Sequence, residues 1–375
     1  MKFKVSQEDL ASGLQLVQRA VAARAPMPVL AGILVETTPE GLTLTATDQE
    51  IGVRVSVPAT VSDDGALVLP TRIGDIVRKF PFGEVSVETE EANNTATVTW
   101  ERSRFVIHGF PAGDFPPFPE PPERKALTLS KGDLRRLVRQ TGFAVSHDDS
   151  RPVFTGVLVT VEDGRVRFVA TDGFRLAVAE GLVGPDSAET RGDFIIPGRA
   201  LAEVARVLGE EGDGTVALSL AEKRAFFEAD GQRVVCRLIE GQFPPYKQVI
   251  PKQFVTRMTC STQGLLDACE RASLIARDVG QAIRLHVNGT SLVITASVPE
   301  VGTAREEVPI ESQGDSLEIA FNPRYLVDGL RNIDTEKLVY DFTGPLSPSC
   351  IRPLCQDESA APSFTYVVLP MRLIS

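Results

Sequence analysis

One pattern occurs three times in this chain, and this repeat limits the possible folds more than any other feature. A serine typical of a helix N-cap stands at Ser6, Ser130 and Ser261, and in each copy residues suited to a buried helix face follow 4, 8 and 11 positions later. That spacing places them on one face of a helix. The sequence therefore predicts three equivalent helices, each near the start of a similar domain.

Each copy continues with the same order of predicted elements. Strand-like runs flank a turn, as in residues 32–36 and 42–48, and a second amphipathic helix is predicted after each of three markers. These markers are 127 and 125 residues apart, at Pro70, Pro197 and Asn322. We therefore expect an α+β fold of three tandem domains. Each domain would hold two β-α-β-β-β units, with two helices packed on one side of the sheets.

Proline-rich segments separate the copies. The first runs from Phe115 to Pro122, and the second is Phe243-Pro244-Pro245-Tyr246. Such segments are typical of linkers. The predicted domains are residues 1–125, 126–253 and 254–375.

Composition narrows the class of protein. The chain has 375 residues, of which 43% are hydrophobic, so it can bury a core in each of several domains. No apolar run is long enough to span a membrane, and the N-terminus reads as a strand and not as a signal peptide. We therefore expect a cytoplasmic protein without a membrane role.

Cysteine and histidine usage argues against a metal or cofactor site. The five cysteines form no Cys-x-x-Cys pair and there are only three histidines, so we predict no metal, no cofactor and reduced, structural cysteines. Phosphate-binding glycine loops and nucleophile elbows are also missing.

Basic residues recur in step with the repeat, although the formal net charge is −11. They stand two and nine positions after the markers, off the apolar face: Arg72, Arg199 and Arg324, then Lys79, Arg206 and Arg331. A solvated helix face would explain any one copy. Three copies in an acidic chain favour sequence-independent contact with phosphates.

Thr47-Asp48 and Thr171-Asp172 occupy equivalent positions at predicted strand ends. Two carboxylates in one cleft would suit a hydrolase, but the repeat places Asp48 and Asp172 in different domains. Turn chemistry at the strand end is the preferred interpretation. We predict no catalytic residues.

The terminal stretch from Tyr366 to Leu373 is unusually apolar for a chain end. One interpretation is a buried strand, predicted over 366–369, that closes a core. The other is that the tail, with the adaptable Met371, forms a wall of a groove for a partner peptide.

Three stretches together resemble the bacterial DNA sliding clamp, the beta subunit of the DNA polymerase III holoenzyme. They are residues 170–178 (Ala-Thr-Asp-Gly-Phe-Arg-Leu-Ala-Val), 242–246 (Gln-Phe-Pro-Pro-Tyr) and 367–373 (Val-Val-Leu-Pro-Met-Arg-Leu), and the resemblance extends over essentially the whole chain. Phe174 departs from the pattern, since many relatives carry histidine there.

This resemblance implies a non-catalytic processivity factor. The expected assembly is a head-to-tail homodimer that closes into a ring around double-stranded DNA, with helices inside and sheets outside. Expected partners are the DNA polymerase III catalytic subunit, the clamp loader complex, and other polymerases and repair proteins that carry clamp-binding motifs. A monomeric three-repeat scaffold for proteins, without a DNA role, is the alternative.

The resemblance also assigns site residues. The partner-peptide cleft would consist of Phe154, Thr171, Gly173, Phe174, Arg175, Leu176, Pro244, Val249, Asn322, Tyr325, Leu346, Val367, Leu369, Pro370, Met371, Arg372 and Leu373. DNA contacts would come from Arg24, Arg72, Arg151 and Arg199. The dimer interface would contain Phe105, Ile107, Leu274 and Ile275.

Overall fold

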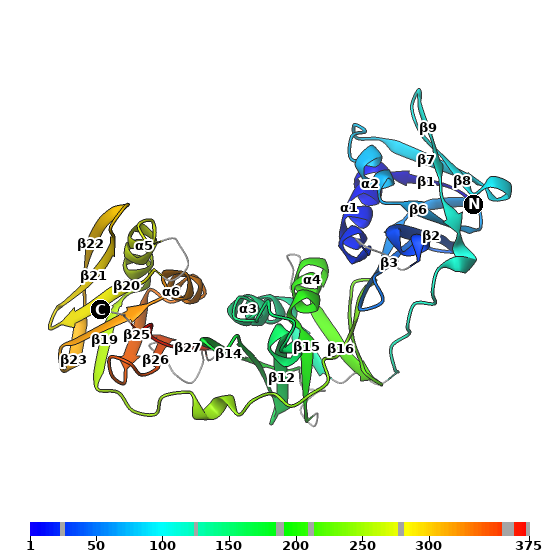
Figure 1. Ribbon diagram of the computed structural model, residues 1–375. Helices are drawn as coiled ribbons and strands as arrows, with labels where there is room; N and C mark the ends of the chain where they lie inside the picture. The colour runs from blue at the N-terminus through cyan, green and yellow to red at the C-terminus, as the bar shows by residue number, and fades with distance from the viewer. Residues whose placement is uncertain are drawn as a thin grey trace. The chain divides into compact units, whose positions relative to one another are not determined.

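Three repeats with one order of elements make up the fold (Figure 1). The computed structural model describes residues 1–22, 27–123, 127–184, 191–208, 214–276, 281–354 and 364–372. In each repeat a strand leads into a helix, three strands follow, and the same order then runs a second time. The predicted β-α-β-β-β unit is therefore present six times.

The first repeat has two additional short strands, β5 and β10. Its elements are β1 (Lys2–Ser6), α1 (Gln7–Val17), β2 (Gly32–Thr38), β3 (Gly41–Thr47), β4 (Ile51–Pro58), β5 (Thr60–Asp63), β6 (Ala66–Pro70), α2 (Arg72–Val77), β7 (Glu84–Glu90), β8 (Thr95–Trp100), β9 (Ser103–His108) and β10 (Phe110–Pro111).

The described part of the second repeat adds no strands to this order. Its elements are β11 (Leu127–Ser130), α3 (Lys131–Gly142), β12 (Gly156–Glu162), β13 (Arg165–Thr171), β14 (Arg175–Leu182), β15 (Gly192–Pro197), α4 (Gly198–Leu208), β16 (Thr215–Ala221), β17 (Arg224–Ala229) and β18 (Gln232–Arg237).

The third repeat has one additional strand, β23. Its elements are β19 (Thr256–Ser261), α5 (Thr262–Ser273), β20 (Ile283–Asn288), β21 (Ser291–Val298), β22 (Gly302–Pro309), β23 (Glu311–Gly314), β24 (Leu317–Phe321), α6 (Pro323–Leu330), β25 (Lys337–Phe342), β26 (Ser349–Pro353) and β27 (Phe364–Val368).

The three predicted serine caps are confirmed. The hydroxyl oxygen of Ser6 accepts the backbone N–H of Asp9 at 3.0 Å, and that of Ser130 accepts the N–H of Asp133 at 3.0 Å. Ser261 accepts the N–H of Gly264 at 3.2 Å. Each bond satisfies a donor that the first helical turn leaves free, which is worth about 1 kcal/mol.

Below each cap, the predicted apolar stripe is buried. Leu10, Leu14 and Val17 of α1 are at most 1% exposed, and the equivalent residues of α3 and α5 are also buried. These stripes pack the helices onto the sheets, with α1 against β3 and β4 and α5 against β21 and β22. In the first and third repeats the two helices also contact each other, α1 with α2 and α5 with α6.

The two halves of a repeat exchange their first strands. In the first repeat β1 pairs with β7, and β6 pairs with β2. The same exchange pairs β11 with β16 and β15 with β12, and then β19 with β25 and β24 with β20. Every strand pair in these sheets is antiparallel. Because the halves exchange strands, each repeat folds as an interlocked unit.

Neighbouring repeats join by pairing their edge strands. β4 pairs with β18, which produces a nine-stranded sheet in the order β10-β6-β2-β3-β4-β18-β17-β16-β11. β14 pairs with β27 in a second nine-stranded sheet, in the order β15-β12-β13-β14-β27-β26-β25-β19-β23. The remaining sheets are β5-β1-β7-β8-β9 and β22-β21-β20-β24.

These shared sheets divide the chain differently from its linkers. One compact unit contains residues Met1–Leu134 and Arg199–Leu238, and the other contains Arg135–Gly198 and Ile239–Ser375. The central repeat is split because β12 to β15 belong to one nine-stranded sheet, whereas β11 and β16 to β18 belong to the other. Domain boundaries near 125 and 253 stay a prediction from the sequence.

None of the described helices combines the length and the apolar character needed to cross a bilayer.

Candidate functional site

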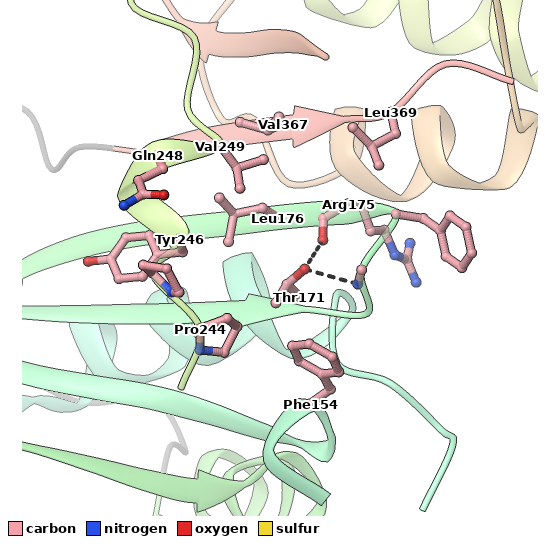
Figure 2. Close-up of a pocket in the computed structure, with 13 residues that line it drawn as sticks. Phe154, Thr171, Arg175, Leu176, Pro244, Tyr246, Gln248, Val249, Val367 and Leu369 are labelled. Carbon is pink, nitrogen blue, oxygen red and sulfur yellow. Dashed lines mark hydrogen bonds between the residues drawn. The ribbon is translucent and has the colours of Figure 1, made fainter. Parts of the chain in front are cut away.

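An apolar groove lies where the second repeat joins the third, within one compact unit (Figure 2). Its cavity volume is about 310 Å³. We use "the groove" for the space lined by Phe154, Thr171, Gly173, Phe174, Arg175, Leu176, Pro244, Pro245, Tyr246, Gln248, Val249, Val367 and Leu369. Its size and mostly apolar walls suit a few side chains of a bound peptide.

Two strands from different repeats form the floor of the groove. Leu176 of β14 lies directly opposite Val367 of β27, and both are buried, with exposed fractions of 3% and 1%. They belong to a core cluster that also holds Val178, Ile195 and Cys350. Figure 2 shows them beside Val249 from the linker that follows the second repeat.

A tight turn between β13 and β14 forms one end of the groove. The Thr171 hydroxyl donates to the carbonyl of Arg175 at 2.6 Å and accepts the N–H of Gly173 at 3.1 Å. The Asp172 carboxylate accepts the N–H groups of Phe174 and Arg175. Gly173 has a φ of +94°, a conformation that side chains rarely adopt. The turn is thus held by its own hydrogen bonds and projects Phe174 outward, 57% exposed.

The equivalent turn in the first repeat has the same bonds. Thr47 donates to the carbonyl of Ile51 at 2.9 Å, and the Asp48 carboxylate accepts the N–H groups of Glu50 and Ile51. The preferred interpretation of the Thr-Asp pairs as turn chemistry is therefore confirmed. Each carboxylate also binds an arginine, Asp48 with Arg199 and Asp172 with Arg175, both at 3.0 Å.

Arg175 fixes the strands beneath the groove. Its guanidinium is buried and bonds to Asp172 at 3.0 Å and to Asp328 of α6 at 2.7 Å. It also lies over the rings of Tyr325 and Phe143, at 4.6 and 5.5 Å from their centroids. Burial works to lower the pKa of this guanidinium, but Tyr366, Asp328 and Asp172 raise it above its ordinary value. The charged form therefore persists and ties β14 to α6.

Tyr246 closes the linker side of the groove. It belongs to a 3-10 helix, Tyr246–Gln248, and its ring packs edge-on against Phe243, which in turn packs edge-on against Phe154. Burial raises the pKa of the Tyr246 phenol, although Arg167 works to lower it. The phenol therefore stays neutral at ordinary pH.

Ten predicted cleft residues line the groove: Phe154, Thr171, Gly173, Phe174, Arg175, Leu176, Pro244, Val249, Val367 and Leu369. Six others do not: Asn322, Tyr325, Leu346, Pro370, Met371 and Arg372. Leu373 lies outside the described residues. The roles of these seven residues in peptide binding stay predictions.

The six differ in how near they come to the groove. The ring of Tyr325 stacks on Phe174 at 6.3 Å, so Tyr325 adjoins it. The Asn322 side chain caps α6 by accepting the N–H of Arg324. The Met371 N–H donates to the carbonyl of Ala320 at 2.8 Å, and Leu346 is 64% exposed.

Three lining residues were not predicted: Pro245, Tyr246 and Gln248. The signal in the sequence is the Phe-Pro-Pro-Tyr segment, which indicates a linker and belongs to a family motif but does not by itself indicate a groove wall. Proline and aromatic residues in a linker pack well against a neighbouring apolar surface. Here that surface is the cluster around Leu176 and Val367.

The junction of the first and second repeats has the same strand pairing but a different surface. Gly52 lies opposite Val235 there, as Leu176 lies opposite Val367. The N–H of Arg237 donates to the carbonyl of Glu50 at 3.0 Å, matching the bond from Leu369 to Phe174 at 2.9 Å. Glu50 and Arg237, which are charged, thus stand where the groove has the apolar wall residues Phe174 and Leu369.

Phe118 from the first linker covers this junction. A Cβ on Gly52 would lie 2.7 Å from the Phe118 ring, and the ring is only 9% exposed. The guanidinium of Arg54 lies 4.4 Å from the ring centroid. Glu120, two residues on, binds both Arg54 and Arg233. The place that corresponds to the groove is filled by the chain itself.

The recurring basic residues have different surroundings in the three copies. In the second copy Arg206 bonds to the carbonyl of Leu16 at the end of α1 and to Glu203. In the third copy Arg331 binds Glu270 at 2.7 Å, and Arg324 lies 3.7 Å from Asp328. In the first copy Arg72 and Lys79 are exposed. Intramolecular contacts therefore engage several of these cations.

The four arginines predicted to contact DNA differ in their exposure and in their partners within the chain. Arg24 lies outside the described residues, and Arg72 is exposed at the start of α2. Arg199 is exposed but paired with Asp48. Arg151 lies over the Phe154 ring and within 3.6 Å of the place where a Cβ of Gly173 would be, so it borders the groove. Their role in DNA binding stays a prediction.

The predicted interface residues also differ in exposure. Leu274 and Phe105 are 54% and 40% exposed, Ile275 is half-buried, and Ile107 is 8% exposed. Ile107 therefore belongs mainly to the core of its own repeat.

In the part of the chain that the structure describes, no group of three or more acidic, histidine or cysteine side chains could hold a metal ion.

The fold and the groove define a class: modular binding proteins built from tandem α+β domains. Models of the DNA polymerase III beta subunit match the chain in three parts, the N-terminal domain at residues 1–119, the central domain at 128–245 and the C-terminal domain at 247–372. The chain belongs to this family, that of the bacterial beta sliding clamps.

Individual relatives match along the whole chain. The beta sliding clamp of Synechococcus elongatus is 33% identical over 381 residues and covers 100% of both chains. Among solved structures, the sliding clamp of Bacillus subtilis is 28% identical with a TM-score of 0.93, again over 100% of both chains. A Pseudomonas aeruginosa clamp bound to griselimycin is 32% identical, with a TM-score of 0.90 and the same full coverage.

Proposed function

We propose that this chain is a non-catalytic processivity factor of bacterial DNA replication. Two copies close head to tail into a ring around double-stranded DNA, slide along it, and hold replication proteins through the groove. Membership of the beta sliding clamp family supports this function, because the relatives along the whole chain are named sliding clamps.

The observation that carries the ring is the repeated junction. Within the chain, β4 pairs with β18 and β14 pairs with β27. In both junctions, the last strand of the first β-α-β-β-β unit of one repeat pairs with the last strand of the second unit of the next repeat. Among the described residues, β22 and β9 are the corresponding strands left at sheet edges. Pairing β22 of one chain with β9 of another repeats the internal junction. Such a heterologous contact must close by rotation or extend into a filament.

Side chains at the two edges support this contact. Phe105 and Val106 of β9 are 40% and 55% exposed, and Leu274 after α5 is 54% exposed. Exposed apolar groups on an unpaired edge strand are unfavourable in an isolated chain. A second copy covers them, and the predicted domain boundaries then delimit six similar domains in one ring.

The groove takes a short linear segment of a partner. The apolar floor of Leu176 and Val367 suits aliphatic and aromatic anchors, and the ordered turn at Thr171 offers polar groups that orient them. Partners of this kind are the DNA polymerase III catalytic subunit, the clamp loader complex, and other cytoplasmic polymerases and repair proteins. The predicted cleft residues that adjoin the groove, such as Tyr325, extend it.

Contact with DNA is electrostatic and independent of sequence. Arg72 supplies an exposed cation, and Arg24, Arg151 and Arg199 are the other proposed contacts. In an acidic chain a few such contacts give weak binding that salt weakens further. A closed ring is retained on DNA by topology and not by affinity.

Retention on circular DNA tests this function. The protein is loaded onto nicked circular DNA and then washed at high salt. A ring stays on the circle and leaves when the DNA is cut once, because it slides off the ends. Equal loss from circular and linear DNA would contradict the proposal and favour the monomeric scaffold.

A further inference from the structure

A second surface lies on the same sheet face as the groove. We call it the basic pocket: a hollow of about 410 Å³ lined by Pro251, Lys252, Gln253, Phe254, Arg257, Asp341 and Arg352. Three cations face one carboxylate, so the pocket carries two positive charges. This is unusual in a chain whose formal net charge is −11.

The buried Asp341 organises the basic pocket. It is 4% exposed, and Arg257 binds both of its oxygens, at 2.5 and 2.8 Å. Arg352 adds a third bond at 3.0 Å. The guanidinium of Arg257 also stacks on the Phe254 ring, 4.0 Å from its centroid. Two arginines are therefore held in place before any ligand arrives.

The cations retain binding capacity. The side chains of Arg257 and Arg352 are 39% and 35% exposed, and Asp341 occupies only some of their donors. Lys252 is exposed and has no carboxylate partner among the described residues. Held guanidinium groups with free donors suit carboxylates.

A straight row of residues connects the basic pocket to the groove. Val367 of β27 lies opposite Cys350, Cys350 lies opposite Asp341, and Asp341 lies opposite Arg257. Residues directly opposite each other in a sheet point to the same face. Three strand-to-strand steps of about 5 Å place Arg257 roughly 15 Å from the floor of the groove.

One linker borders both places. Gln248 and Val249 line the groove, and the next residues, Pro251 to Phe254, line the basic pocket. Ile250 between them packs on the core cluster under the groove. A bound chain that leaves the groove along this side reaches the basic pocket within about five extended residues.

We infer that the basic pocket binds acidic residues that flank the apolar anchors of a partner peptide held in the groove. This inference rests on the proposed function of the groove. Acidic flanks add charge contacts to the apolar ones, and these charge contacts are screened by salt.

Fluorescent peptides test the inference. The neutral probe carries a glutamine followed by spaced leucine and phenylalanine. Two acidic probes add four aspartates before or after these anchors, and matched probes add four asparagines. At low ionic strength we expect one acidic probe to bind about five- to tenfold more tightly than its asparagine counterpart, since exposed ion pairs are individually weak.

Two variants locate the charges responsible. Lys252→Gln combined with Arg352→Gln removes the advantage of the acidic probe but keeps the affinity for the neutral probe, which reports a folded groove. Arg257 is left in place because it holds Asp341. Lys223→Gln with Arg224→Gln, at the turn between β16 and β17 and outside the lining of the basic pocket, removes the same charge and keeps the advantage.

The outcomes separate this inference from the function of the groove. If the neutral probe binds but aspartates add nothing, or the double variant keeps their advantage, the inference is wrong and the groove is unaffected. If no probe binds, the proposed function of the groove fails, and the inference fails with it.

Discussion

Leu176 of β14 and Val367 of β27 are direct cross-strand partners, so the floor of the groove belongs to two repeats at once. Both are buried in the cluster that joins these repeats. Changing either would disturb the junction as well as the groove. Tests of binding are therefore better placed on the walls.

Leu369→Ala tests the groove wall. Leu369 lines the groove and is half-buried, and its backbone N–H bonds to the Phe174 carbonyl whatever its side chain. We expect peptide affinity to fall about tenfold, the effect of losing one anchor contact, while the melting temperature changes little. Leu182→Ala is the matched control, because Leu182 is exposed, does not line the groove and is not among the predicted cleft residues. An unchanged affinity in Leu369→Ala would exclude this wall from the site.

Phe105→Asp combined with Leu274→Asp tests the ring. Both residues are exposed in the single chain, so the change leaves the fold intact but places charge in an apolar seam between copies. Light scattering should give one chain of 40.6 kDa where the unchanged protein gives twice that mass. Leu182→Asp, at an exposed leucine in β14, should leave the dimer intact. A dimeric double variant would remove β9 and α5 from the interface.

Arg206→Ala should affect stability, whereas Arg72→Ala should affect DNA binding. Arg206 bonds to the Leu16 carbonyl at 2.6 Å, where a cation stabilises the C-terminus of α1, so its loss should lower the free energy of unfolding by about 1–2 kcal/mol. Arg72 is exposed, so its loss should leave stability unchanged and weaken salt-dependent DNA binding. Urea unfolding and DNA titration over a range of salt concentrations measure the two effects. Equal destabilisation by both changes would contradict this division.

Alkaline pH should destabilise the fold. Burial raises the pKa of Cys236, Cys260, Cys269 and Cys350 to about 12. Above about pH 9 the unfolded chain releases thiol protons that the folded chain retains. Stability is therefore complete at neutral pH and falls as pH rises from about 9 towards 12. Urea midpoints at pH 7.5 and 10 measure this, and Cys236→Ala should reduce the slope. A flat profile over this range would be inconsistent with buried thiols.

The repeat made most of the fold predictable. Capping serines, apolar stripes and the markers Pro70, Pro197 and Asn322 are local signals, and the described helices follow them. The pairing of β14 with β27 is not a local signal, because it joins residues nearly two hundred positions apart. The division into two compact units depends on that pairing, and a proline-rich linker does not reveal it.

The groove was only partly predictable, because local motifs indicate some of its residues and others depend on contacts between distant segments. Family motifs indicated Gly173 to Leu176 and Val367 to Leu369, which the structure brings together. Tyr246 belongs to one of these motifs but not to the predicted cleft, because its place depends on how the linker folds back onto the sheet. Arg151 was predicted to contact DNA, yet its guanidinium lies over Phe154 at the groove. Side-chain direction after the irregular turn before β12 does not follow from sequence spacing.

The position of Phe118 over Gly52 affects how many partners the assembly can hold. Two junctions with the same strand pattern occur in the chain, and the first is occupied from within. Of these two junctions, only the second therefore offers the groove in the part of the chain that the structure describes. Valency is then set by the number of chains that assemble, so partners that use the groove must compete for it or take turns.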